Sequence, residues 1–97
     1  MTEHEQLKWI CDTIGYESNY LYDTSPFGKH CVWIWYTEIV WDSIRVVDPR
    51  EIIFTTEFME RLWKTLPEDM HYSDVMFNLH LHLDDPVSYL YNLLKWQ

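Results

Sequence analysis

Ninety-seven residues suffice for one domain, and the sequence predicts that residues 1–97 form it. Hydrophobic residues make up 47% of the chain and aromatic residues 18%, which excludes intrinsic disorder. Seven Lys and Arg stand against sixteen Asp and Glu, so the formal net charge is −9. Such a chain repels phosphate backbones and anionic lipids, so it predicts neither direct nucleic-acid binding nor membrane attachment.

The compartment follows from the first residues and the longest apolar run. Residues 1–4 are polar and lack the pattern of a signal peptide, and the apolar run 32–36 is too short to cross a bilayer. We therefore expect the protein in the cytosol. Cys11 and Cys31 are the only cysteines, and in that compartment we expect both to be reduced and buried.

The chain opens with a helix. Thr2 and Glu5 have the spacing of a capping box, and an apolar stripe at helical spacing follows. Gly15 stands where a glycine commonly ends a helix.

Strands are expected next. Residues 16–22 predict an edge strand, residues 23–29 a turn, and residues 31–41 the main strand, since Val, Ile, Trp, Tyr and Thr dominate it. Both faces of residues 31–41 are apolar, which fits a strand covered twice, an aromatic face that meets a partner, or a hairpin that turns near Thr37 and Glu38. We expect residues 44–47 to extend the sheet.

The second half of the chain predicts helices. Asp48 and Pro49 start a brief one, Thr56 caps the next, and Pro67 stops it. In residues 75–83 apolar side chains alternate with polar ones, as in a strand, but Leu, Met and His favour a helix, which we prefer. Asp85 and Pro86 start the last helix. The fold class expected is α+β, with an N-terminal helix, a small antiparallel sheet with a hairpin around residues 31–47, and two to three C-terminal helices.

Three segments resemble short uncharacterised proteins encoded by phages and other mobile elements. They are residues 7–16 (LKWICDTIGY), 47–59 (VDPREIIFTTEFM) and 84–94 (DDPVSYLYNLL), about a third of the chain. Their residues are caps and core positions, so the resemblance implies a shared fold and no catalytic residues. It also implies a role in host interaction or counter-defence.

The sequence gives only weak indications of a catalytic or metal-binding site. His80 and His82 could share an ion, with a third ligand from Asp84, His71 or Asp74, only on a strand, because a helix turns the two histidines about 200° apart. No nucleophile has a recognisable base and orienter, and the adjacent carboxylates are explained by turns and helix starts. The sequence therefore predicts no enzyme, no metal and no cofactor.

A protein-binding function remains. An acidic surface attracts a basic one, and Trp is favoured at binding hot spots. The expected partner-binding residues are Glu38, Asp42, Glu68, Asp69, Asp74, Asp84, Asp85, Trp33, Trp35 and Trp41. The expected partner is the basic surface of a host nucleic-acid-binding protein, blocked by nucleic-acid mimicry as an anti-CRISPR inhibitor would do. The alternative is a self-associating structural module, with a homodimer formed through the two-sided apolar strand.

Overall fold

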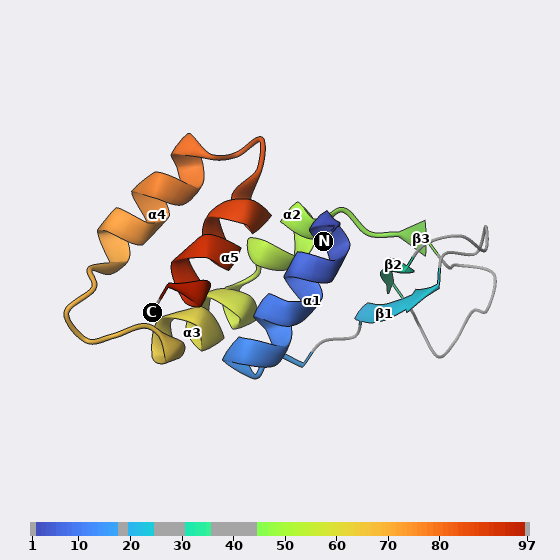
Figure 1. Ribbon diagram of the computed structural model, residues 1–97, viewed down its shortest axis with the longest axis horizontal. Coiled ribbons are helices and arrows are strands. Elements are labelled where there is room, and N and C mark those ends of the chain that lie inside the picture. Colours follow the sequence, from blue (N-terminus) through green and yellow to red (C-terminus); the bar gives the residue numbers. More distant parts are fainter. Residues whose placement is uncertain (1, 18–19, 25–30, 36–44, 97) are drawn as a thin grey trace.

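The structure is a computed structural model that describes residues 2–17, 20–24, 31–35 and 45–96 (Figure 1). Its elements are α1 (Glu3–Ile14), β1 (Tyr20–Thr24), β2 (Cys31–Trp35), β3 (Arg45–Val46), α2 (Pro49–Ile53), α3 (Thr56–Thr65), α4 (Tyr72–Leu81) and α5 (Pro86–Lys95).

The first helix begins and ends as the sequence predicts. The Thr2 hydroxyl accepts a hydrogen bond from the Glu5 backbone N–H, and the Glu5 carboxylate accepts one from the Thr2 N–H. Both ends of this capping box satisfy backbone donors that the helix leaves unpaired. Gly15 follows the helix with φ 71°, a left-handed conformation that glycine adopts without steric cost.

Side-chain caps also start the later helices. Asp48 accepts from the Arg50 N–H before α2, and Asp85 accepts from the Ser88 N–H before α5, so both predicted caps are confirmed. The predicted cap of α3 is wrong by one residue. Thr55 precedes that helix, accepts from the Phe58 N–H and donates to the Ile52 carbonyl, which ties the end of α2 to the start of α3.

The core is made by helices packing on helices. Among the described residues it contains these side chains: Leu7, Ile10, Cys11, Ile14, Tyr16, Trp33, Val47, Ile52, Ile53, Phe58, Leu62, Leu66, Val75, Leu79, Val87, Leu90 and Leu94. Of these, Trp33 comes from β2, and every helix contributes at least two. Each helix therefore buries its apolar stripe against other helices.

The expected α+β class is therefore wrong, because the described part of the chain is mostly helical and its five helices bury one another. No sheet forms a layer beneath the helices among the described residues. The short strands pair antiparallel in the order β1-β2-β3 and lie at one end of the helical body (Figure 1). The sequence prediction overestimated the strands because strand propensity reports only that β-branched and aromatic residues suit a half-buried surface, and it does not say which elements form the core.

Two details of the strand predictions also change. The edge strand β1 begins at Tyr20, whereas Tyr16 lies in the core with its ring 5.3 Å from that of Phe58. The main strand ends at Trp35 in the described part of the chain. The turn proposed near Thr37 and Glu38 falls in residues 36–44, outside the described residues.

Residues 75–83 are helical up to Leu81, so the preference for a helix is confirmed. This segment forms most of α4, which lies beside α5 (Figure 1). Burial and the nearby Asp74 carboxylate raise the pKa of Tyr89 in α5, against a hydrogen bond with Asn78 of α4 that lowers it. Asn78 and Asp74 of α4 thus both interact with Tyr89 of α5, which helps to hold the two helices together.

A hydrogen bond between His4 and Trp33 joins the helical body to the strands. The backbone N–H of Trp33 donates to Nδ1 of His4 over 3.1 Å. Burial lowers the pKa of His4 from its ordinary value of 6.5, although the Glu3 and Asp48 carboxylates oppose the shift. Neutral His4 is therefore the form that the fold favours, and only that form can accept this hydrogen bond.

We expect Leu90→Ala to lower the free energy of unfolding by about 3 kcal/mol, because Leu90 is fully buried in α5 and its removal leaves a cavity. Leu81→Ala on the neighbouring helix is the matched control. Leu81 is 61% exposed, so we expect a change below about 0.5 kcal/mol. Urea denaturation followed by circular dichroism measures both, and equal losses would contradict the described burial.

We expect His4→Ala to cost about 1 kcal/mol at pH 7.5, where the wild-type imidazole accepts from Trp33. Because the folded pKa is lowered, the unfolded chain binds the proton more readily, and the wild type loses this contribution as the pH falls below 6.5. The gap between wild type and variant should therefore shrink on acidification. Urea titrations at several pH values test this, and a gap independent of pH would refute it.

Candidate functional site

The carboxylates lie on the outside of the fold. Among the acidic residues whose side chains the structure describes, Glu3 is half-buried and the others are exposed. Of the predicted binding residues, Glu68, Asp69, Asp74, Asp84 and Asp85 belong to this exposed set. Glu38 and Asp42 fall outside the described residues.

Two ion pairs occur within the described part of the chain. Lys8 Nζ lies 2.8 Å from an Asp12 carboxylate oxygen one helical turn away, and Arg50 Nη1 lies 3.2 Å from Asp48. Arg50 also donates to the backbone carbonyls of Leu83 and Asp84, so it fastens the α4–α5 turn to α2. The hydrogen bond that the Arg50 backbone N–H donates to Asp48 holds the pKa of that carboxyl below its ordinary value, and the Arg50 guanidinium lowers it further.

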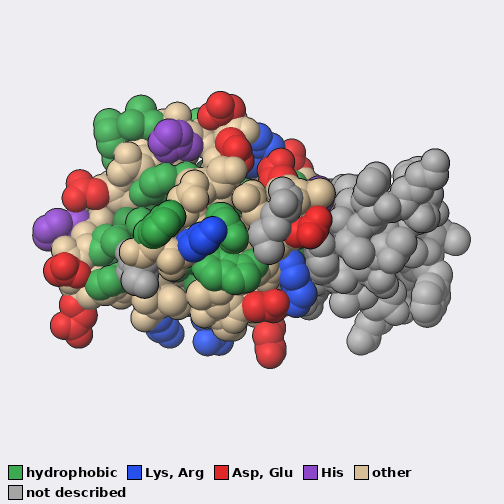
Figure 2. Space-filling view, viewed as in Figure 1, with side chains coloured by type: hydrophobic (Ala, Val, Ile, Leu, Met, Phe, Trp, Pro, Cys, Tyr) green, Lys and Arg blue, Asp and Glu red, His purple; other side chains and the backbone are tan. Residues whose placement is uncertain are grey.

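The negative charge is concentrated where no cation stands in the sequence. Residues 65–94 contain no Lys or Arg, and they include the α3–α4 connection, α4 and the α4–α5 turn. We call Glu68, Asp69 and Asp74 the acidic end. None of these three side chains makes an ion pair with another described residue. Figure 2 shows red side chains gathered at this end of the molecule, over the α3–α4 connection.

Next to the acidic end, α4 exposes large apolar side chains. Val75 and Leu79 face the core at 3% and 0% exposure, whereas Phe77 and Leu81 are 64% and 61% exposed. A step of two residues turns the side-chain direction by about 200° around the helix axis. Alternate apolar residues of this segment therefore point to opposite sides of α4. We call Phe77 and Leu81 the outer face of α4. Figure 2 shows hydrophobic side chains exposed over α4 and α5.

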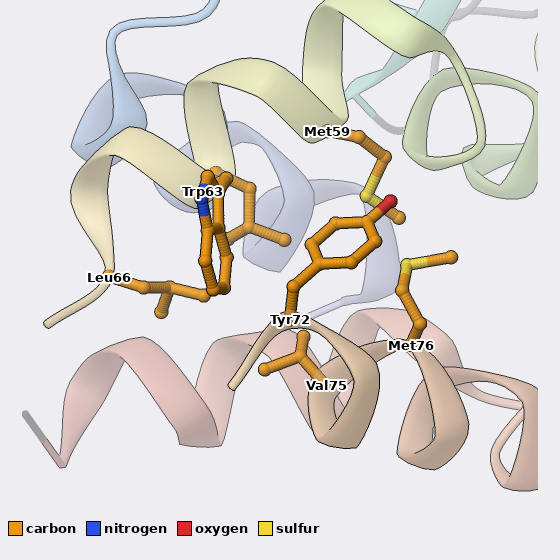
Figure 3. Close-up of a pocket in the computed structure, with 7 residues that line it drawn as sticks. Met59, Trp63, Leu66, Tyr72, Val75 and Met76 are labelled. Carbon is orange, nitrogen blue, oxygen red and sulfur yellow. The ribbon is translucent and has the colours of Figure 1, made fainter. Parts of the chain in front are cut away.

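A shallow apolar crease separates α3 from α4. It is lined by Met59, Leu62, Trp63, Leu66, Tyr72, Val75 and Met76. The Trp63 and Tyr72 rings meet edge to face, with centroids 5.2 Å apart, and Tyr72 lies between Trp63 and the two methionines (Figure 3). The side chains fill the crease, so it serves to pack α4 on α3 and is too closed to admit a small ligand.

The predicted tryptophan anchors are placed differently from the acidic residues. Trp33 is only 5% exposed and belongs to the core. Its burial indicates that this side chain packs inside the fold and is not offered to a partner. Trp35 ends β2, where its backbone pairs with Tyr20 and Arg45. Trp41 lies outside the described residues.

The histidines that could have bound a metal have other neighbours. His80 Nδ1 lies 2.7 Å from the Met76 carbonyl, and the His82 ring stacks on Tyr89 with centroids 5.4 Å apart. Within the described ranges, no three side chains of the metal-binding types converge.

Cys11 is enclosed in the core. It is 2% exposed, and burial together with Asp12 raises the pKa of its thiol to about 12. The thiolate is the reactive form of cysteine, so Cys11 is chemically inert in the folded protein.

Sequence reasoning did not identify Phe77 and Leu81 as surface residues. The signal was the period-two apolar pattern in residues 75–83. On a strand that pattern puts all its apolar residues on one face, but on a helix it divides them between the core and the surface.

The chain matches no family model, no curated protein and no solved structure. The resemblance of its three segments to phage and mobile-element proteins stays a prediction. Among the described helices, none has the length and apolar character needed to cross a bilayer.

We expect Cys11 to resist a thiol reagent in the folded protein and to react fast in denaturant. The suitable protein is Cys31→Ser, which leaves Cys11 as the single thiol. Absorbance after addition of Ellman's reagent at pH 8 measures the rate, and we expect unfolding to accelerate it by at least about a hundredfold. Rapid labelling of the folded variant would contradict the described burial.

Proposed function

We propose that this protein is a protein-binding module whose acidic surface recognises a basic surface on another protein. The acidic end supports this proposal most directly, because Glu68, Asp69 and Asp74 are exposed and have no ion-pair partner among the described residues. Uncompensated surface charge of one sign steers an oppositely charged partner and raises the rate of encounter.

The overall charge supports the same partner chemistry. A net charge of −9 on a chain of this size leaves an excess of carboxylates after the described ion pairs with Lys8 and Arg50 are allowed for. Basic surfaces on proteins commonly serve to hold nucleic acid. The narrower proposal is therefore that the chain occupies such a surface in place of nucleic acid, as an anti-CRISPR inhibitor would. The cytosol, of the host cell if a phage encodes the chain, is the compartment that suits this role.

A self-associating module is the second candidate. The exposed Phe77 and Leu81 favour it, because a second copy could cover them. The charge opposes it, since two chains of net charge −9 repel each other. Sedimentation at tens of micromolar distinguishes the two candidates, because a strict monomer contradicts self-association.

We expect the tagged protein to capture basic proteins from a bacterial lysate at roughly 50 mM salt and to release them at roughly 500 mM, because salt screens exposed charges. Neutralising the acidic end with Glu68→Gln, Asp69→Asn and Asp74→Asn should reduce the capture. The matched control removes three exposed carboxylates elsewhere, with Glu17→Gln, Glu57→Gln and Glu60→Gln, and should retain more of it.

Mass spectrometry of the eluate identifies the captured proteins, and a mobility-shift assay tests whether the chain displaces nucleic acid from them. Recovery of no protein, or of neutral proteins only, would contradict the proposed function. A basic partner that still binds its nucleic acid in the presence of the chain would contradict the mimicry alone.

A further inference from the structure

We propose that the outer face of α4 docks an amphipathic helix of the partner protein, with Lys or Arg side chains at both ends of the partner's apolar stripe. This inference rests on the proposed function and assigns it a surface and a class of partner segment.

The position of α4 creates the docking face. Its inner side chains, Val75 and Leu79, are buried, and the Met59–Trp63–Tyr72 crease packs the start of the helix on α3. The opposite side points away from both neighbours and carries Phe77 and Leu81, one helical turn apart. A helix with apolar residues on opposite faces normally buries both.

The apolar surface continues beyond the end of the helix. Leu83 follows α4 and is 49% exposed. Phe54, after α2, is 39% exposed, and its ring centroid lies 6.3 Å from that of His80. Phe54 therefore lies beside α4 at His80, and Leu83 extends the exposed apolar residues past the end of that helix.

Carboxylates stand at both ends of this face. Asp74 precedes Phe77 by three residues, so the two lie on the same side of α4. Asp84 and Asp85 follow Leu83 and are exposed. Arg50 is the cation that contacts this turn among the described residues, and it is already paired with Asp48.

This charge arrangement selects the occupant. In a symmetric dimer each copy would bring the same carboxylates to the ends of the shared face, so the ends would meet with like charge. A basic amphipathic helix would instead place an apolar pair at i and i+3 or i+4 over Phe77 and Leu81. Asp74 lies seven residues, about 10 Å along the helix, before Leu81, and Asp84 follows beyond the end of α4, so the cations of the partner should stand more than about 10 Å apart on either side of its apolar pair.

A display library of 18-residue helical peptides, selected against the full-length protein, tests the proposal. We expect the enriched peptides to combine an apolar pair at i and i+3 or i+4 with flanking Lys or Arg. Fluorescence anisotropy then measures how tightly these peptides bind the double variant Phe77→Ala, Leu81→Ala. Alanine favours a helix, so this variant keeps α4 intact. We expect this variant to bind at least about tenfold more weakly, because two apolar side chains no longer transfer from water into the interface.

Trp96→Ala is the matched control, since Trp96 is 80% exposed and lies outside α4, and it should bind like the wild type. Circular dichroism checks that all variants remain folded. No enrichment, enriched peptides without basic residues, or equal binding to the Phe77→Ala, Leu81→Ala variant would each overturn the inference. A wild-type dimer that this variant converts to a monomer would also overturn it, because a second copy would then be the occupant.

The same variants separate this inference from the proposed function. If the Phe77→Ala, Leu81→Ala variant captures basic proteins as the wild type does, while neutralising the acidic end abolishes capture, the docking face is refuted and the acidic module stands. If neither variant loses capture of basic proteins, both the inference and the role of the acidic end are refuted.

Discussion

The apolar stripe of α5 is the contact on which the described helical body depends. Val87 and Leu90 are fully buried, and α5 packs against α1, α2 and α4. Asp85 and Pro86 set the start of this helix, and the Asp85 cap fixes where its stripe begins. The position of α4, and thus the direction of Phe77 and Leu81, follows from how α4 rests on α5 and on the crease with α3.

Surface charge and surface hydrophobicity meet on one element. Glu68 and Asp69 are placed by the α3–α4 connection, Asp74 by the first turn of α4, and Asp84 and Asp85 by the turn that Arg50 fastens to α2. Both sets therefore stand at the ends of α4, on either side of its exposed apolar residues. Charge supplies long-range attraction and apolar contact supplies short-range affinity, so their combination suits a binding surface better than either does alone.

Local signals in the sequence were sufficient for the starts of α1, α2 and α5, whereas the predicted cap of α3 was wrong by one residue. The Thr2–Glu5 capping box and the Asp48 and Asp85 caps depend on side chains that bond to backbone groups two or three residues away. The α+β prediction failed because strand propensity reports a preference for half-buried surfaces and says little about which elements form the core. Trp33 was likewise misassigned, because an aromatic residue suits both a core and a binding hot spot. Its exposure of 5% depends on α1 and the other elements that pack around it.

The sequence by itself determined the charge excess, the absence of cations from residues 65–94 and the caps of α1, α2 and α5, because these depend on residue identity and on contacts within one turn. Only the tertiary structure decided which side of α4 is covered. The alternating apolar residues of 75–83 are equivalent in the sequence, and α5 and α3 bury Val75 and Leu79 while leaving Phe77 and Leu81 in water. That choice depends on contacts between segments distant in the chain, which no local pattern contains.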